Sequence, residues 1–500
     1  MYISTRNDYA KVSAAQAVKL GMAPGGGLFV PERIPTLGPD EIAALQGKSY
    51  QEIAGRILPL YLDDYTAEEI DESIAQAYNG SRFSHPAIAP LRQVNGRTFV
   101  LELWHGPTAA FKDMALQIMP HLLSGAIKKS GTEKEIVILV ATSGDTGKAA
   151  LEGFKDVPGI KIIVFYPYKG VSKVQELQMS TTDGGNTYVV AVKGNFDDCQ
   201  SAVKEIFGDA QFKDILAQQG YELSSANSIN WGRLLPQIVY YFYAYADLLG
   251  KKEIQPGEQI NFVVPTGNFG NILAGWYAAA MGLPIHKLIC ASNENKVLAD
   301  FFAKGVYNRN RPFIQTMSPS MDILISSNLE RFLFEMSDHD RIKLNGWMNE
   351  LATAGSFTVD TEIKEKIDEI LAAGYATEEE TLSTIKKYYE TAGYTLDTHT
   401  AVGMKVYEAY VQSTGDQRKT VLDATASPFK FNASVLKALK GEEAVSGKDE
   451  MVILEELSET TRQPVHPSLR GLDQKPVLHR RVCEKDEIKG AVADILKLNN

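Results

Sequence analysis

VILVATSGDTGKAALEGF, residues 137–154, decides the fold class, because a short apolar run passes through a small, hydroxyl-rich turn directly into an amphipathic stretch. Four to eight apolar residues bounded by turn residues are typical of a buried strand, and residues 148–155 have helical spacing. A strand followed at once by a helix is the repeating unit of a parallel α/β sheet. We therefore expect an α/β fold with doubly wound, mostly parallel sheets in two lobes.

The same alternation recurs along the chain. A second amphipathic helix is expected over residues 234–249. The predicted buried strands are residues 99–103, 136–141, 162–166, 262–264, 288–291 and 421–422.

The sequence predicts four parts with different patterning. These are an N-terminal lobe (1–95), a large domain (96–130 and 230–440), a smaller domain (131–229) and a C-terminal extension (441–500). The N-terminal part has mostly helical periodicity after the turn-rich stretch 21–35. Residues 330–395 are dense in Glu and Lys and lack strand patterning, so we expect a solvated helical insertion within the large domain.

Composition excludes several classes of protein. A formal net charge of −11 argues against nucleic-acid binding. The three cysteines, Cys199, Cys290 and Cys483, are far apart, and the eight histidines show no HxH or HExxH spacing, so neither a disulfide framework nor a metal site is expected. No uninterrupted apolar run reaches about 18 residues, so we expect no membrane spans. We expect a cytosolic protein, with a matrix protein that has lost a transit peptide as the alternative.

Two loops have the pattern of anion sites, in which free amides at a helix start point into a turn where glycine permits close approach. They are VVPTGNFGNILAGW at 263–276 and the opening stretch at 137–154. An ordinary glycine turn or capping loop explains either one equally well when it is taken alone. The second loop is not a nucleotide P-loop, because Thr142 and Ala149 replace the required glycine and hydroxyl.

Lys112 is the candidate nucleophile. It lies at the predicted start of an apolar helix, where a partly desolvated amine would have a lowered pKa and could form a Schiff base. A solvated surface lysine is the commoner reading of one such residue. Thr425 and Ser427 end the last predicted strand and could face a ligand, although capping of the next helix is the simpler explanation.

Taken together and in this order, these motifs resemble the threonine synthases, in the tryptophan-synthase β-like group of pyridoxal-phosphate enzymes. HGPTAAFKD around Lys112 is similar to the family's cofactor-lysine motif, TSGDTGKAA at 142–150 to its substrate loop, and PTGNFGN at 265–271 to its phosphate-binding loop. Further resemblances are GGGLFVP at 25–31, NSINWGRLLPQ at 227–237, ASNENKVLADFF at 291–302, SPSMDI at 318–323, SSNLERF at 326–332 and DTHTAVG at 397–403.

The resemblance implies pyridoxal 5'-phosphate as cofactor, bound as a Schiff base to Lys112, with Thr425 facing the pyridine nitrogen. It implies that the cofactor phosphate is held by Gly267, Asn268, Phe269, Gly270 and Asn271. One departure bears on this site: the family usually reads TAHPAKF where this chain reads TASPFKF, with Ser427 in place of histidine and Phe429 in place of alanine.

The implied reaction converts O-phospho-L-homoserine and water into L-threonine and phosphate. The implied substrate residues are Ser143, Asp145, Thr146, Asn227, Asn230 and Arg233. A phosphate dianion favours charge-assisted donors, for which arginine is the preferred partner. Which of these residues meets the carboxylate and which the phosphate stays open, and we expect a monomer or homodimer.

Three alternatives remain at this point. A related pyridoxal-phosphate lyase would eliminate phosphate from the same substrate to give a ketoacid. A dinucleotide-binding oxidoreductase is disfavoured, because no predicted strand is followed by GxGxxG and a later acidic residue. An inactive relative is disfavoured because Lys112, the 267–271 loop and Thr425 occur together. His105, inside the cofactor-lysine motif, is as well explained by a structural role.

Overall fold

Two sheets organise the computed structural model, which describes residues 1–142 and 144–498. The larger sheet has six strands in the order β13-β10-β9-β14-β4-β3, and only the β3–β4 pairing is antiparallel. Its strands are β3 (Leu91–Gln93), β4 (Thr98–Glu102), β9 (Ile260–Pro265), β10 (Ile285–Ser292), β13 (Leu371–Tyr375) and β14 (Thr420–Ala424).

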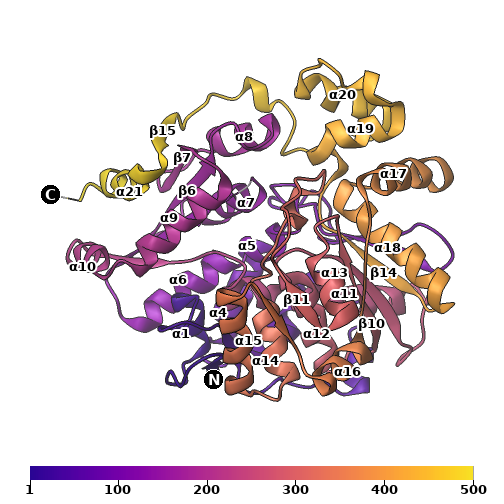
Figure 1. Cartoon of the computed structure of the whole chain (residues 1–500), viewed down its shortest axis with the longest axis horizontal. Helices are drawn as coiled ribbons and strands as arrows, with labels where there is room; N and C mark the ends of the chain where they lie inside the picture. The colour runs from indigo at the N-terminus through magenta and orange to yellow at the C-terminus, as the bar shows by residue number, and fades with distance from the viewer. Residues whose placement is uncertain (143, 499–500) are drawn as a thin grey trace.

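The smaller sheet has five strands in the order β15-β7-β6-β5-β8, all paired in parallel. Its strands are β5 (Glu135–Ala141), β6 (Ile160–Pro167), β7 (Thr187–Lys193), β8 (Tyr221–Ser224) and β15 (Arg481–Glu484). The two sheets and their helices lie side by side in Figure 1. The predicted α/β class and all six predicted strands are confirmed.

Two short antiparallel strand pairs, β1 (Tyr2–Ser4) with β2 (Phe29–Pro31) and β11 (Val306–Asn308) with β12 (Ser356–Thr358), and the helices complete the structure. The helices that precede β8 in the sequence are α1 (Ala14–Leu20), α2 (Pro39–Ala43), α3 (Tyr50–Ile57), α4 (Ala67–Ala77), α5 (Asp113–Leu116), α6 (Met119–Ser130), α7 (Asp145–Phe154), α8 (Lys173–Ser180), α9 (Phe196–Gly208) and α10 (Ala210–Gln218). The later helices are α11 (Trp231–Gly250), α12 (Gly270–Ala280), α13 (Val297–Lys304), α14 (Leu329–Met336), α15 (Arg341–Thr353), α16 (Thr361–Ile370), α17 (Glu378–Ala392), α18 (Thr398–Thr414), α19 (Asn432–Lys440), α20 (Glu450–Thr461) and α21 (Ile488–Leu496).

Successive residues of the buried strands enter different cores, as the pleat of a strand requires. In β9, Phe262 and Val264 join the core that contains α11 and α12, while Val263 between them joins the core that contains α18. Strand β5 divides in the same way between the main core and a smaller core under α9 and α21. Both sheets are therefore covered on both faces, which explains why their strands appear as continuous apolar runs in the sequence.

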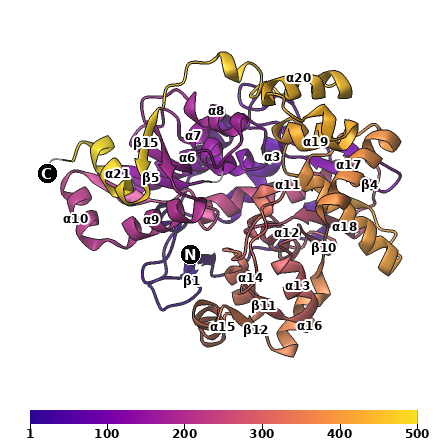
Figure 2. The same cartoon turned by 45° about the horizontal axis from the view of Figure 1, so that its top comes forward.

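The stretch 330–395 is helix-rich, as expected, but the expectation that it holds no strand is wrong in two places. Strand β13 pairs in parallel with β10 at the edge of the six-stranded sheet, and β12 pairs with β11. Strand β13 reads LAAGY, and its small residues carry no alternation that would mark a strand in the sequence. The region's helices α14, α15 and α16 lie beside β11 and β12 in Figure 2. The four-part division of the chain stays a prediction.

The C-terminal segment returns to the smaller sheet. After α20 the chain crosses above α8 and forms β15, which pairs with β7, as the yellow segment in Figure 1 shows. The side chain of His479 contacts the carbonyl oxygen of Thr182 at 2.8 Å along this crossing. Across the described residues, no helix combines the length and the apolarity needed to cross a membrane.

Candidate active site

The carboxyl ends of parallel strands place the predicted site residues at one edge of the large sheet. Strands β4, β9 and β14 end at Glu102, Pro265 and Ala424, and the loops that follow carry Lys112, the 267–271 stretch and Thr425. Open α/β sheets bind ligands outside these strand ends.

Strand β14 brings Thr425 directly beside Lys112. The carbonyl oxygen of Thr425 accepts a hydrogen bond from the amide of Phe111 at 2.8 Å, next to an isolated bridge between Ala110 and Ala426. Lys112 itself is the N-cap of α5, as its position in the sequence predicted. Ser427 instead caps the turn that follows it, because its hydroxyl accepts from the amide of Phe429 at 3.4 Å.

The Lys112 amine is largely buried, with 13% of its side chain exposed, and the carboxylate of Asp145 lies nearby. Its Nζ lies 3.7 Å from Asp145 Oδ2 and 3.4 Å from Ser320 Oγ. Burial lowers the pKa of Lys112 to about 8, an effect that Asp145 opposes and that the nearby charges of Lys430 and Arg233 reinforce. An amine with this pKa is partly neutral near physiological pH, which a nucleophilic lysine requires.

Asp145, at the first position of α7, is the charged centre of the site. Its Oδ1 accepts hydrogen bonds from Gln175 Nε2 at 2.9 Å and lies 3.0 Å from Lys430 Nζ, while Oδ2 accepts from Ser320 Oγ at 3.0 Å. Burial disfavours the ionised form, but the charges of Lys430 and Lys112 outweigh it and hold the pKa of Asp145 below its usual range. Asp145 is therefore a buried carboxylate between two lysines.

Sequence reasoning assigned no role to Lys430. Its side chain is fully buried, and its Nζ also donates to the carbonyl oxygen of Thr108 at 2.9 Å, inside the cofactor-lysine motif. Lys430 thus joins three motifs that are distant in the sequence. The only signal for it in the sequence is its place within TASPFKF at 425–431, the motif that carries Thr425 and the two departures from the family pattern.

The 267–271 loop forms a turn of main-chain amides at the start of α12. Phe269 has a φ of 65°, a conformation uncommon for a residue with a side chain, and the helix begins at Gly270. Among the described residues, the amides of Gly267, Asn268 and Phe269 donate to no acceptor. Free amides at a helix N-terminus, with the positive end of the helix dipole behind them, bind phosphate. We call residues 267–271 the amide loop.

Neighbouring residues fix the shape of the amide loop. Asn328 donates to the carbonyl oxygen of Asn268 from both its amide and its side chain, each at 3.1 Å. A Cβ at Gly267 would lie 2.5 Å from the carbonyl oxygen of Ser320, so only glycine fits there. Asn271 points its side-chain oxygen at the hydroxyls of Tyr240 and Tyr241, at 2.5 and 2.8 Å.

The predicted substrate residues lie around this site in different ways. Thr146 follows Asp145 and is half-buried, and Asn227 is half-buried on the loop that Asn328 joins to Asn268. Arg233 is buried, and its Nε has no partner among the described residues, although its Nη1 donates to Ala226 O at 2.6 Å. Ser143 lies outside the described residues.

Asn230 has no free donor. Its Nδ2 donates to the carbonyl oxygens of Val18 and Ser225, both at 2.9 Å, and its Oδ1 accepts from the amide of Gly232 to cap α11. The side chain therefore holds the N-terminal lobe against α11. His105 also forms a structural contact, with Nε2 2.8 Å from Glu102 Oε2.

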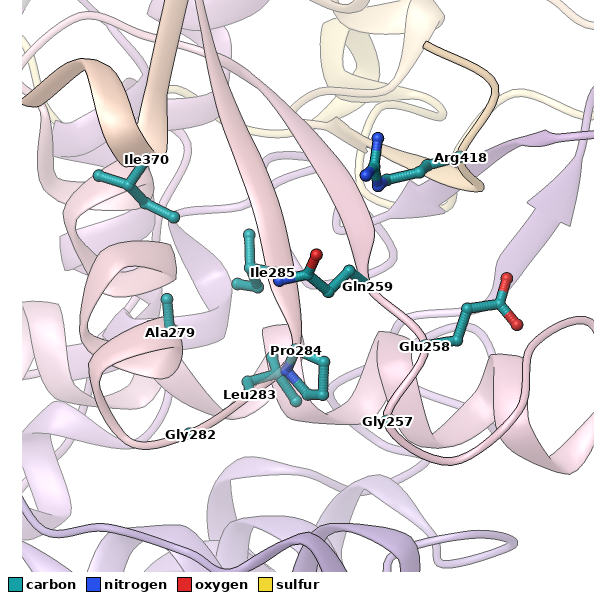
Figure 3. A pocket seen from close by; sticks show the side chains of 10 residues that line it. All are labelled: Gly257, Glu258, Gln259, Ala279, Gly282, Leu283, Pro284, Ile285, Ile370 and Arg418. Carbon is teal, nitrogen blue, oxygen red and sulfur yellow. The ribbon is translucent and has the colours of Figure 1, made fainter.

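A surface pocket lies at the opposite edge of the large sheet (Figure 3). It is lined by residues that precede β9, β10 and β14, among them Gln259, Pro284 and Arg418. No predicted site residue lines it. The pocket lies at the amino ends of the strands, so it is distinct from the candidate site.

Comparison with known families agrees with this geometry along almost the whole chain. The family described as Threonine synthase N terminus matches residues 1–78, Pyridoxal-phosphate dependent enzyme matches residues 85–422, and Threonine synthase, C-terminal matches residues 400–490. The chain belongs to the threonine synthase family of pyridoxal-phosphate-dependent enzymes. This membership confirms the pyridoxal-phosphate-dependent enzyme family that the motifs predicted.

Individual members of the threonine synthase family are similar over most of their length. Threonine synthase of Schizosaccharomyces pombe is 38% identical, over 88% of this chain and 89% of that protein. The crystal structure of pyridoxal-phosphate-bound threonine synthase from Brucella melitensis is 37% identical, covers 99% of this chain and 98% of its own, and has a TM-score of 0.87. Human threonine synthase-like 1 is 41% identical over 97% of this chain, which spans only 65% of that protein's length.

Proposed function

We propose that this chain converts O-phospho-L-homoserine and water into L-threonine and phosphate. The observation that carries the proposal is the largely buried Lys112 amine, with a pKa of about 8, beside Asp145, together with a loop whose amides donate to no acceptor among the described residues. The amine supplies a nucleophile, and the amides supply an anion site. The full-length similarity to threonine synthases of fungi and bacteria supports the substrate.

The chemical groups at the candidate site fit those of pyridoxal phosphate. The cofactor's phosphate would take the free amides of Gly267, Asn268 and Phe269, where a larger residue at 267 would collide with Ser320. Lys112 would hold its carbonyl carbon. Thr425 would face the ring nitrogen, and a neutral hydroxyl there leaves that nitrogen largely unprotonated.

When bound, pyridoxal phosphate supplies an electron sink that makes the substrate's α- and β-protons removable. Lys112 is the base placed to take a proton, because its lowered pKa keeps a neutral amine available. Arg233, whose Nε–H has no partner among the described residues, would donate to an anionic group of the substrate, and the charge of Lys430 would add to the same positive potential. The buried surroundings exclude water and strengthen each of these charges.

The test is product analysis on the purified protein loaded with pyridoxal phosphate. The expected products from O-phospho-L-homoserine are threonine and phosphate in equal amounts. K112A should lower the rate by about 10³-fold or more, whereas K128A, which removes an exposed lysine from α6, should not change it. Release of 2-oxobutanoate would replace the proposed reaction with elimination alone. An undiminished rate in K112A would refute the role of Lys112.

A further inference from the structure

The 3-10 turn Pro319–Met321 connects the two parts of the candidate site. Its central residue, Ser320, accepts a hydrogen bond from Lys112 Nζ at 3.4 Å and donates one to Asp145 Oδ2 at 3.0 Å. Its carbonyl oxygen presses on the amide loop, since a Cβ at Gly267 would approach it to 2.5 Å. One residue therefore touches the nucleophile, its carboxylate and the amide loop.

A buried histidine holds this turn from behind. The amide of Ser320 donates to Nε2 of His399 at 3.2 Å, and Nδ1 of His399 lies 3.0 Å from Asp397 Oδ1. His399 is 2% exposed and Asp397 is 1% exposed. Because Nε2 accepts a hydrogen bond, the ring's proton resides on Nδ1 and is donated to Asp397, which fixes the orientation of the ring.

The other side of the turn is fixed by a second carboxylate. Asp322 accepts hydrogen bonds from Thr316, through its amide at 2.9 Å and its hydroxyl at 2.7 Å. It also accepts from the side chains of Asn293, at 2.7 Å, and Asn295, at 3.1 Å. An ordinary connecting turn does not need so many hydrogen bonds. Here they fix the turn that carries Ser320, whose hydroxyl contacts the Lys112 amine.

We propose that Ser320 is a further catalytic residue, which orients the amine of Lys112, and that His399 and Asp397 are positioning residues that act through it. With the Ser320 hydroxyl proton committed to Asp145, its oxygen lone pair is directed at Lys112. This hydrogen bond holds the Lys112 amine in one orientation. The lone pair of the amine then stays available to attack a carbon atom or to accept a proton. This inference rests on the proposed function of Lys112.

The experiment compares four variants of the holoenzyme, S320A, H399L, H399Q and S337A. S337A is the matched control, since Ser337 is a buried serine at the end of α14 whose hydroxyl, among the described residues, donates only to the carbonyl oxygen of Phe334. The measurements are kcat and KM separately, the absorbance spectrum of the bound cofactor, and the thermal midpoint.

S320A should lower kcat by about 10- to 100-fold with a much smaller change in KM, because the interaction serves the reacting amine rather than substrate binding. It should also shift the absorbance of the cofactor held by Lys112. H399L should act in the same direction. H399Q should recover most of the activity, because its side-chain oxygen can accept from the amide of Ser320.

Two results would overturn the proposal. One is a kcat in S320A within twofold of that in S337A. The other is a folded H399Q, with an unchanged thermal midpoint, that is as impaired as H399L. If the wild-type protein forms no threonine, the proposed reaction fails instead, and the absorbance shift in S320A still decides whether Ser320 acts on Lys112.

Discussion

In the proposed function, the amide loop and the surroundings of Lys112 hold one cofactor, but they present different chemical groups. The amide loop presents main-chain amides, held by Asn328 and by the collision that excludes a side chain at Gly267. The lysine side presents charged groups, with Asp145 buried between Lys112 and Lys430. Main-chain dipoles need no compensating charge, whereas each buried charge must be paired.

This difference determines how each part can fail. Side-chain substitutions do not remove main-chain donors, so the amide loop loses its anion site only when a substitution changes the shape of the backbone. A charge cluster is damaged by changes of charge, and a second change that restores neutrality can repair its stability. The predictions below address the two parts separately.

The largest expected effect is on the charge cluster. K430M leaves the Asp145 carboxylate buried without its closest cation and should destabilise the protein by about 3 kcal/mol. The double variant D145N/K430M should recover most of this loss but not the activity. K437M is the control, since Lys437 forms a surface pair with Glu442 worth at most about 1 kcal/mol. Thermal unfolding measures all three, and equal midpoints for K430M and K437M would refute the importance of the buried pair.

A smaller effect is expected in the amide loop. G267A forces a methyl group against the backbone oxygen of Ser320 and should weaken pyridoxal-phosphate affinity by about 10- to 100-fold, from overpacking of 1–3 kcal/mol. G270A is the control, because its Cβ would meet only side-chain atoms at 3.5 Å or more. Equilibrium dialysis gives both affinities. A G270A protein that binds the cofactor more weakly than G267A would contradict this account of the loop.

The smallest expected effect is a pH dependence of stability, which comes from Asp423 beneath the amide loop. Asp423 accepts from Tyr241, which also supports Asn271, and burial raises the pKa of Asp423 to about 7. The folded state thus retains a proton that the unfolded state releases near pH 4, so this group's contribution to stability is lost as pH rises towards 7. D423N cannot ionise, so its thermal midpoint relative to that of the wild type should be a few degrees higher at pH 8 than at pH 5.

The control for that prediction has the opposite sign. Burial opposes ionisation of Asp416, but hydrogen bonds from Arg418 and Asn261 hold its pKa at about 2. D416N should therefore lower the thermal midpoint at pH 5 and at pH 8 alike. A D423N midpoint that is no higher relative to the wild type at pH 8 than at pH 5 would contradict the raised pKa of Asp423.

The main-chain part of the site was the predictable part. A loop such as 267–271 is contiguous, and its strand, glycines and helix start are visible in one stretch of sequence. The buried strands were predictable for the same reason, and β13 was missed because alanine and glycine carry no alternation. The position of Lys112 at a helix start was also a local property.

The side-chain part required three-dimensional information. Lys430 contacts Thr108 from 322 positions away, and Ser320 contacts Lys112 from 208 positions away. Nothing local to either residue indicates the contact, although both lie within motifs that resemble the family. Asn230 lies in such a motif too, but its side chain caps α11 and donates a hydrogen bond to the N-terminal lobe. A family motif therefore identifies which residue occupies a position but does not reveal the role of that residue.

The pairing of β15 with β7 has a consequence for synthesis on the ribosome. Strand β7 ends at Lys193, and its partner β15 begins at Arg481, on the order of 300 residues later. At the usual 5–20 residues per second, one edge of the smaller sheet stays open for roughly 15–60 s while the rest of the chain emerges. An open strand edge is a site of aggregation. The nascent chain therefore carries an unpaired strand edge, which favours misassembly, while residues 194–480 are translated.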